Sequence, residues 1–120
     1  MPGGTRRGKK PRDYAVSGDW PYAVMESVRQ AQIGQAVARA LTEAMERRGL
    51  SANALATASG VNRQVISNIL AGIVWPDMFT LASLEEALDE VLWPRHTDWP
   101  VGDGGARRQP IPKRRRSGEG

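Results

Sequence analysis

The 120-residue sequence contains no cysteine, which excludes disulfide bridges and thiolate metal sites. Its single histidine, His96, has only Asp98 close by in sequence, and that pair does not complete a metal site or a proton relay. No apolar run is long enough to cross a bilayer, and the first residues lack the apolar region of a signal peptide. We therefore expect a soluble, intracellular protein without a membrane partner.

Catalytic patterns are missing as well. The sequence has no Ser/His/Asp arrangement, no glycine-rich loop that would cradle a phosphate, and no pair of carboxylates placed for acid–base chemistry. We therefore expect no enzyme activity, no cofactor, no metal and no small-molecule substrate.

The charged residues are distributed unevenly. Residues 1–12 carry five basic residues and no acid, and residues 106–120 carry six against one, whereas residues 13–105 hold six arginines against twelve acids. Basic ends of this kind can lie along the phosphates of a nucleic acid, although they can also serve only solubility. Arginine outnumbers lysine fourteen to three, which is typical of GC-rich bacterial genomes, so we expect a location in the bacterial cytoplasm, associated with the nucleoid.

Composition divides the chain into three parts. Residues 1–18 and 94–120 are rich in glycine, proline and charge, which predicts two basic flexible tails. Residues 19–93 carry helical periodicity, which predicts an all-α domain, a compact bundle of four or five helices. Every tryptophan precedes a proline, a pattern typical of helix boundaries; the alternative is a set of aromatic anchors for a dimer or for the tails.

Turn and capping residues set the expected helix limits. Asp19-Trp20-Pro21 is typical of a helix start and predicts a first helix as far as Gln32, with Gly34 as a break. The following helices are expected at 33–48, 52–58, 63–71 and 78–89. The expected N-caps are Ser51, Asn62 and Asp77, and the expected terminators are Gly49, Gly60 and Gly72.

Residues 51–72 predict two short helices that cross at a tight turn, Gly60-Val61. Ile66 and Ile69 are expected to hold the second helix, within 62–71, against the core. Its outward residues are then Arg63, Gln64, Ser67 and Asn68. Such side chains, early in a rigidly held helix, can contact base edges in the DNA major groove: arginine suits guanine, and glutamine or asparagine suits adenine. The alternative is an ordinary solvated face, with Ser67 bonded to its own backbone.

Residues 34–92 resemble the helix-turn-helix domains of the Cro and phage-repressor type, also called XRE-like. The residues that carry the resemblance are Gly49-Leu50-Ser51, Leu55-Ala56, Gly60-Val61, Ile66-Ser67-Asn68-Ile69, Gly72, Pro76-Asp77-Met78, Thr80-Leu81, Leu84 and Ala87-Leu88. The resemblance implies a helical bundle that binds operator DNA, commonly as a dimer, with Arg63, Gln64, Ser67 and Asn68 at the base-reading positions. The sequence departs from the family at Ala52, where a phosphate-contacting glutamine is frequent, and at Leu70, where glutamate is frequent.

Further residues are candidates for contacts with DNA phosphates. Polar side chains at helix N-termini and the basic residues of both tails have the right chemistry. They are Ser51, Asn62, Arg6, Arg7, Lys9, Lys10, Lys113, Arg114, Arg115 and Arg116. Glu85, Glu86, Asp89 and Glu90 form an acidic cluster, which we expect to be a solvated face; the alternative is a docking site for a basic partner, including the tails.

The leading functional hypothesis is a transcription regulator that binds double-stranded DNA sequence-specifically as a homodimer. Pro21 to Gln32 and Val91 to Trp93 are the candidate dimer surfaces, because both carry apolar residues outside the family-like core. The alternative is an adaptor whose helical bundle binds a protein partner while the basic tails bind DNA without specificity. RNA binding through the tails is a third alternative.

Overall fold

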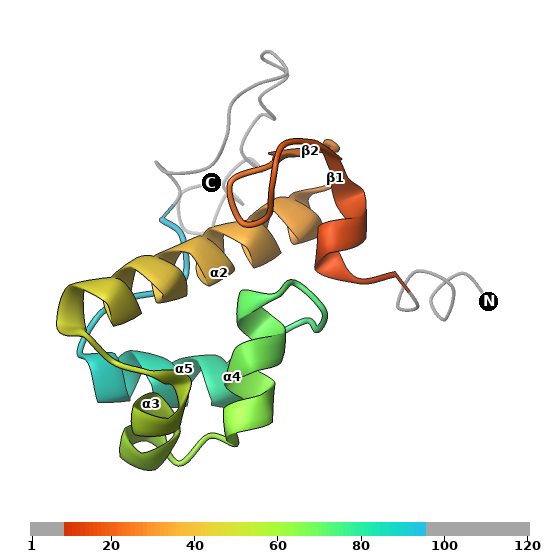
Figure 1. Ribbon diagram of the computed structural model, residues 1–120. Helices are drawn as coiled ribbons and strands as arrows, with labels where there is room; N and C mark the ends of the chain where they lie inside the picture. The colour runs from red at the N-terminus through yellow and green to blue at the C-terminus, as the bar shows by residue number, and fades with distance from the viewer. Residues whose placement is uncertain (1–8, 96–120) are drawn as a thin grey trace, which may run out of the picture.

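The computed structural model describes residues 9–95, which form four α-helices and a small two-stranded sheet (Figure 1). In chain order the elements are η1 (Pro11–Tyr14), β1 (Ala15–Ser17), β2 (Val24–Met25), α2 (Arg29–Arg48), α3 (Ala52–Ser59), α4 (Arg63–Leu70) and α5 (Met78–Leu88). The long helix α2 lies across the three shorter helices, and the sheet sits at its N-terminal end. The expected helical bundle is confirmed. The parts of the two basic tails at 1–8 and 96–120, and His96, lie outside the described residues.

The core is formed where one face of α2 meets α3, α4 and α5. Val37, Leu41 and Ala44 recur at helical spacing on α2 and are all but fully buried. The shorter helices contribute side chains that pack into the same cluster: Leu55, Ile66, Ile69, Leu81, Leu84 and Leu88, closed by Leu92. The apolar spacing in the sequence therefore identified the buried face of each of these helices.

The expected caps are present. The side-chain oxygens of Ser51, Asn62 and Asp77 each accept a backbone amide, at 3.0, 2.7 and 2.7 Å. The hydrogen bond from the Thr80 amide lowers the pKa of Asp77 below its ordinary value, because it favours the ionised carboxylate. Gly60 ends α3 with a φ of 81°, a left-handed conformation that L side chains rarely adopt.

The prediction of a helix from Pro21 to Gln32 is wrong for residues 21–28. This stretch contains β2, which pairs antiparallel with β1, and α2 begins only at Arg29. The buried side chain of Gln35 explains the difference: its Oε1 accepts from the Ala23 amide at 2.8 Å and its Nε2 donates to the Ala23 carbonyl at 3.0 Å. Because these bonds occupy both the amide and the carbonyl of Ala23, neither group is available for the hydrogen bonds of a helix in this stretch.

The expected break at Gly34 is also wrong, and residues 11–17, which the sequence placed in the N-terminal tail, form η1 and β1. Gly34 lies inside α2, and η1 packs beside it: a Cβ atom at this position would make ordinary van der Waals contact with Pro11 Cβ, at 3.5 Å. Residues 9–25, the N-terminal segment, then dock on α4 and on the connection that follows it. The Arg12 amide donates to the Gly72 carbonyl at 3.0 Å, and Trp75 Nε1 donates to the Lys9 carbonyl at 3.0 Å.

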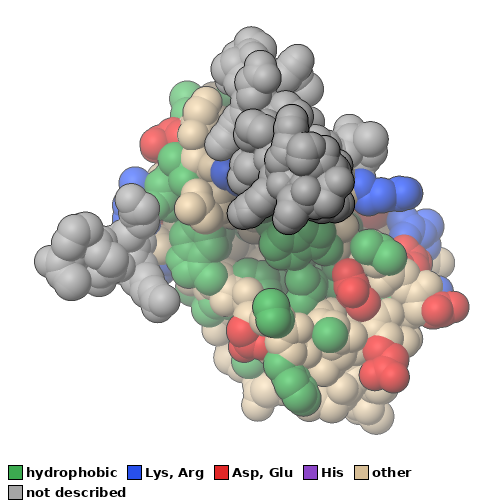
Figure 2. Space-filling view, turned by 180° about the vertical axis from the view of Figure 1, so that it is seen from behind, with side chains coloured by type: hydrophobic (Ala, Val, Ile, Leu, Met, Phe, Trp, Pro, Cys, Tyr) green, Lys and Arg blue, Asp and Glu red, His purple; other side chains and the backbone are tan. Residues whose placement is uncertain are grey.

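The acidic cluster of α5 partly serves the fold. Glu90 forms ion pairs with Arg47 and Arg48 at the end of α2. Glu85 accepts the amides of Leu92 and Trp93, at 2.7 and 3.1 Å. Figure 2 shows acidic and basic side chains close together on this side of the molecule. Glu85 and Glu90, two of the four acids in this cluster, thus fix the segment after α5, whereas Glu86 and Asp89 are exposed to solvent.

Among the described residues, none of the helices has the length and apolarity to cross a membrane.

The contact between Gly72 and the N-terminal segment can be tested by adding one methyl group. A Cβ at Gly72 would lie 2.6 Å from Trp20 Cε2 and 2.8 Å from Arg12 Cβ, whereas a Cβ at Gly60 would meet no atom within 4 Å. The two glycines have similar φ values, 74° and 81°, so they share the backbone strain. We expect Gly72→Ala to lower the free energy of unfolding by about 1–3 kcal/mol more than Gly60→Ala.

Chemical denaturation of both variants and of the unaltered chain measures this difference. Equal losses in the two variants would show that the N-terminal segment is not docked on Gly72.

Candidate nucleic-acid interface

Helix α4 is fixed to the core by one face. Ile66 is fully buried and Ile69 is 2% exposed, one turn further along the same side. Burying each side chain stabilises the fold by about 1.5–3 kcal/mol. Helices α3 and α4 pack against each other across the Gly60 turn, where the Val61 amide donates to Ser59 Oγ at 3.1 Å. The direction of α4 relative to the bundle is therefore set by its buried face and by this turn.

Both ends of α4 are also held. Asn62 Oδ1 accepts the Gln64 amide at the N-terminus, where helical amides otherwise lack partners. At the C-terminus, Trp20 Nε1 donates to the Leu70 carbonyl at 2.9 Å. The carbonyl of Gly72, two residues beyond the helix, accepts from Arg12. An eight-residue helix is thus anchored at its start, its end and along one side.

The opposite face of α4 carries the four residues that the sequence predicted to face outward. Arg63 and Gln64 are exposed, whereas Ser67 and Asn68 are half-buried. Gln64 Nε2 donates to Asn68 Oδ1 at 3.0 Å, so these two amides form one connected surface. The structure therefore brings a guanidinium, a hydroxyl and two amides together on one short helix, which are the groups that can pair with base edges.

The two capping residues that the sequence named for phosphate contacts lie at neighbouring helix starts, Ser51 before α3 and Asn62 before α4. Their oxygens are used as caps, but the Ser51 hydroxyl hydrogen and the Asn62 amide hydrogens remain as donors. Ala52, which replaces the frequent glutamine of the family, is half-buried and packs against the core instead.

Two of the basic residues named for phosphate contacts lie in the described part of the N-terminal segment. Lys9 Nζ stands 4.2 Å from the centre of the Tyr14 ring, and Lys9 and Lys10 are both exposed. The bond from Trp75 to the Lys9 carbonyl places both lysines beside the connection between α4 and α5. The remaining basic candidates are Arg6, Arg7, Lys113, Arg114, Arg115 and Arg116, and they lie outside the described residues.

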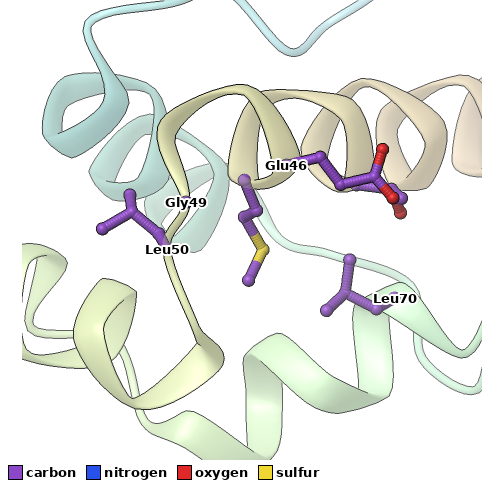
Figure 3. A pocket seen from close by; sticks show the side chains of 6 residues that line it. Glu46, Gly49, Leu50 and Leu70 are labelled. Atoms are coloured by element: carbon purple, nitrogen blue, oxygen red, sulfur yellow. The ribbon is translucent and has the colours of Figure 1, made fainter.

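An open groove of about 440 Å³ lies between the C-terminal half of α2 and the end of α4 (Figure 3). Leu50 and Leu70 border it from opposite sides, and Glu46 is the one titratable residue of the six that line it. A single carboxylate provides no acid–base pair, so the groove does not suggest an active site. Leu70 lines this groove and also packs against the core. These apolar contacts explain why leucine stands at a position where the Cro and phage-repressor type often has glutamate.

Sequence reasoning missed two residues that support the interface, Trp20 and Arg12. Both lie in the N-terminal segment: Trp20 bonds the carbonyl of Leu70, fifty residues away along the chain, and the Arg12 amide bonds the carbonyl of Gly72, just after α4. The signal for Trp20 was its indole N–H, which needs an acceptor when it is partly buried. No local pattern indicates that this acceptor is Leu70.

Within the described residues, 9–95, no group of histidine, cysteine or acidic side chains is placed to hold a metal ion.

Comparison with known families gives a match between residues 41–91 and the family model described as helix-turn-helix. No curated protein matches the chain. The matched segment contains α3, α4 and α5 and the last turns of α2, and it agrees with the crossing of α3 and α4 around Gly60. Residues 41–91 are therefore similar to a helix-turn-helix family, and the match is consistent with a domain of the Cro and phage-repressor type.

Proposed function

We propose that this protein is a sequence-specific transcription regulator that binds double-stranded DNA and reads the major groove with α4. The observation that carries the proposal is the two-sided character of α4. Ile66 and Ile69 fix one face in the core, while Arg63 and Gln64 stand exposed at the N-terminal end of the other. In helix-turn-helix proteins the first residues of the second helix contact base edges, so this arrangement suits sequence recognition.

The proposal includes a homodimer on two half-sites. The described globule is small, and one α4 helix contacts few base pairs, so two copies one helical turn apart would lengthen the recognised sequence. Val91 and Trp93 support a dimer surface after α5, because they are 71% and 49% exposed although both are large and apolar. In the second candidate surface, Tyr22 and Val24 are 57% and 61% exposed, although residues 21–28 form no helix.

The basic arms belong to the same proposal. Lys9 and Lys10 lie beside the connection that follows α4, and Arg6 and Arg7 precede them in sequence. From this anchor an arm can follow the phosphates next to the groove that α4 enters. The arms would supply electrostatic attraction, because Arg63 is the one charged residue of α4. The C-terminal basic residues would contribute in the same way.

A protein-interaction adaptor is the second candidate function. Met78 and Phe79, in the first turn of α5, are 82% and 83% exposed, and two large apolar side chains next to each other in sequence favour a contact with a protein. In that case the bundle would bind a protein, and DNA would be held only by the basic arms.

The α4 proposal predicts the effect of replacing Arg63 and Gln64 together by alanine. Wild-type chain is expected to enrich a sequence motif from a random duplex library at near-physiological salt, and the double variant is expected to lose it. Non-specific, salt-sensitive binding should persist, because it depends on the arms. The chain offers a matched control: Arg29 and Gln30 are also exposed and also begin a helix, α2.

Replacing Arg29 and Gln30 by alanine should leave the enriched motif unchanged. If wild type enriches no motif, or if both double variants retain the same one, then α4 does not read DNA and the adaptor becomes the better account.

The arm proposal predicts a change in salt dependence. Each phosphate contact that is lost reduces the slope of log Kd against log salt concentration by about 0.9. Replacing Arg6 and Arg7 by alanine should therefore flatten the slope by up to about 2 units, whereas replacing both by lysine should leave it unchanged. Fluorescence anisotropy with a labelled duplex over a series of salt concentrations measures the slope. An identical slope in all three proteins would exclude these two residues from the phosphate contacts.

A further inference from the structure

The last turn of α4 takes one of its hydrogen bonds from a distant part of the chain. Carbonyls in the last turn of a helix need partners from beyond its end. Three carbonyls of residues 67–70 accept amides that follow at once in sequence, those of Ala71, Gly72 and Ile73, at 3.0, 3.1 and 3.0 Å. The carbonyl of Leu70 accepts instead from Trp20 Nε1 at 2.9 Å, and these two residues are fifty positions apart.

The indole of Trp20 is also held by packing. It lies against Gly72, where a Cβ atom would stand 2.6 Å from Cε2 and 2.8 Å from Cδ2 of the ring. The Arg12 amide, from the same N-terminal segment, donates to the Gly72 carbonyl at 3.0 Å. Trp20 is half-buried, and the Leu70 carbonyl is the acceptor that its N–H needs there. The N-terminal segment is therefore attached to the end of α4 by both hydrogen bonding and close contact.

This attachment lies at the opposite end of α4 from Arg63 and Gln64. The rise of an α-helix places these residues about 10 Å from Leu70. Ile66 and Ile69 fix one side of the helix between the two ends. Over this length, a tilt of about 6° displaces the first turn by about 1 Å. Such a displacement exceeds the range of hydrogen-bond lengths to a base edge. Contacts with phosphates carry no sequence information, so their loss or adaptation affects all duplexes alike.

We propose that Trp20 is a positioning residue for sequence recognition: its bond to Leu70 sets the tilt of α4, and thereby the ability to discriminate between duplexes. This inference rests on the proposed function, because it requires α4 to lie in the major groove. Trp20 lies outside the segment 41–91 that matches the helix-turn-helix family. The N-terminal segment thus has a role in specificity that is separate from carrying the basic arm.

The chain offers a matched control for Trp20 in Trp75. Both indoles donate to a backbone carbonyl, at 2.9 and 3.0 Å, but Trp75 bonds Lys9 and so holds the start of the arm. Trp20→Phe and Trp75→Phe each keep an aromatic ring and remove the N–H. Gly72→Ala is a second variant that leaves Trp20 unchanged, because the added Cβ would displace the indole from Leu70.

The experiment compares two duplexes on each full-length protein. One is the duplex that wild type enriches from a random library, and the other has the same length and base composition in scrambled order. Dissociation constants for both are measured at one salt concentration, and their ratio is the readout. Because both duplexes are titrated with the same sample, the ratio does not depend on the fraction of protein that is folded. A purely stabilising role of Trp20 would therefore leave the ratio unchanged.

Trp20→Phe and Gly72→Ala are expected to lower the ratio about tenfold or more, since a single well-placed base contact contributes discrimination of that order. Trp75→Phe should weaken binding to both duplexes alike and keep the ratio within about twofold of wild type, because arm contacts are independent of sequence. Should Trp20→Phe bind neither duplex, Gly72→Ala decides by the same criterion.

A wild-type ratio in Trp20→Phe, or an equal fall in Trp20→Phe and Trp75→Phe, would overturn the inference. The enriched motif, and with it the proposed function, would then stand. Failure of wild type to enrich any motif would overturn both.

Discussion

An eight-residue helix does not keep its shape in water by itself, and the proposed reading surface depends on how α4 is held. Its stability comes from outside the helix: two isoleucines in the core, the Asn62 cap at the start, and bonds from the N-terminal segment at the end. These restraints act on different parts of α4, so they fix its rotation as well as its position. A side chain such as Gln64 can then be aimed at a defined point in a groove without losing much conformational freedom on binding.

The same restraints connect α4 to the start of the described chain, where the basic arm begins. Trp20 and Arg12 bond carbonyls at the end of α4, and Lys9, three residues before Arg12, is held by Trp75. The arm therefore leaves the globule at a fixed place next to the end of α4. If the arm follows phosphates, its non-specific attraction and the specific contacts of α4 act on the same stretch of DNA. Gly72, in close contact with Trp20, makes this arrangement possible because a larger residue would not fit.

Local signals in the sequence were sufficient for the helical bundle. The caps at Ser51, Asn62 and Asp77 and the turn at Gly60 follow from the chemistry of single residues and their near neighbours, and the structure contains all of them. The N-terminal segment was different. Tyr22 to Val28 has spacing compatible with a helix, and what opposes a helix there is the bond between Ala23 and Gln35, which exists only once α2 has formed. The contact between Trp20 and Leu70 joins residues fifty positions apart, which no local pattern encodes. For the candidate site, spacing predicted which side chains share a face, but the hydrogen bond between Gln64 and Asn68 is visible only in the structure.

The central claim is that α4 itself, and not only the basic arms, contacts the bases. A crystal structure of the full chain bound to its selected duplex tests this claim most directly. Our account predicts α4 within the major groove, Gln64 within hydrogen-bonding distance of a base edge, and Ile66 and Ile69 still buried in the core. A complex in which α4 lies outside the groove and the duplex is held by other surfaces would contradict it.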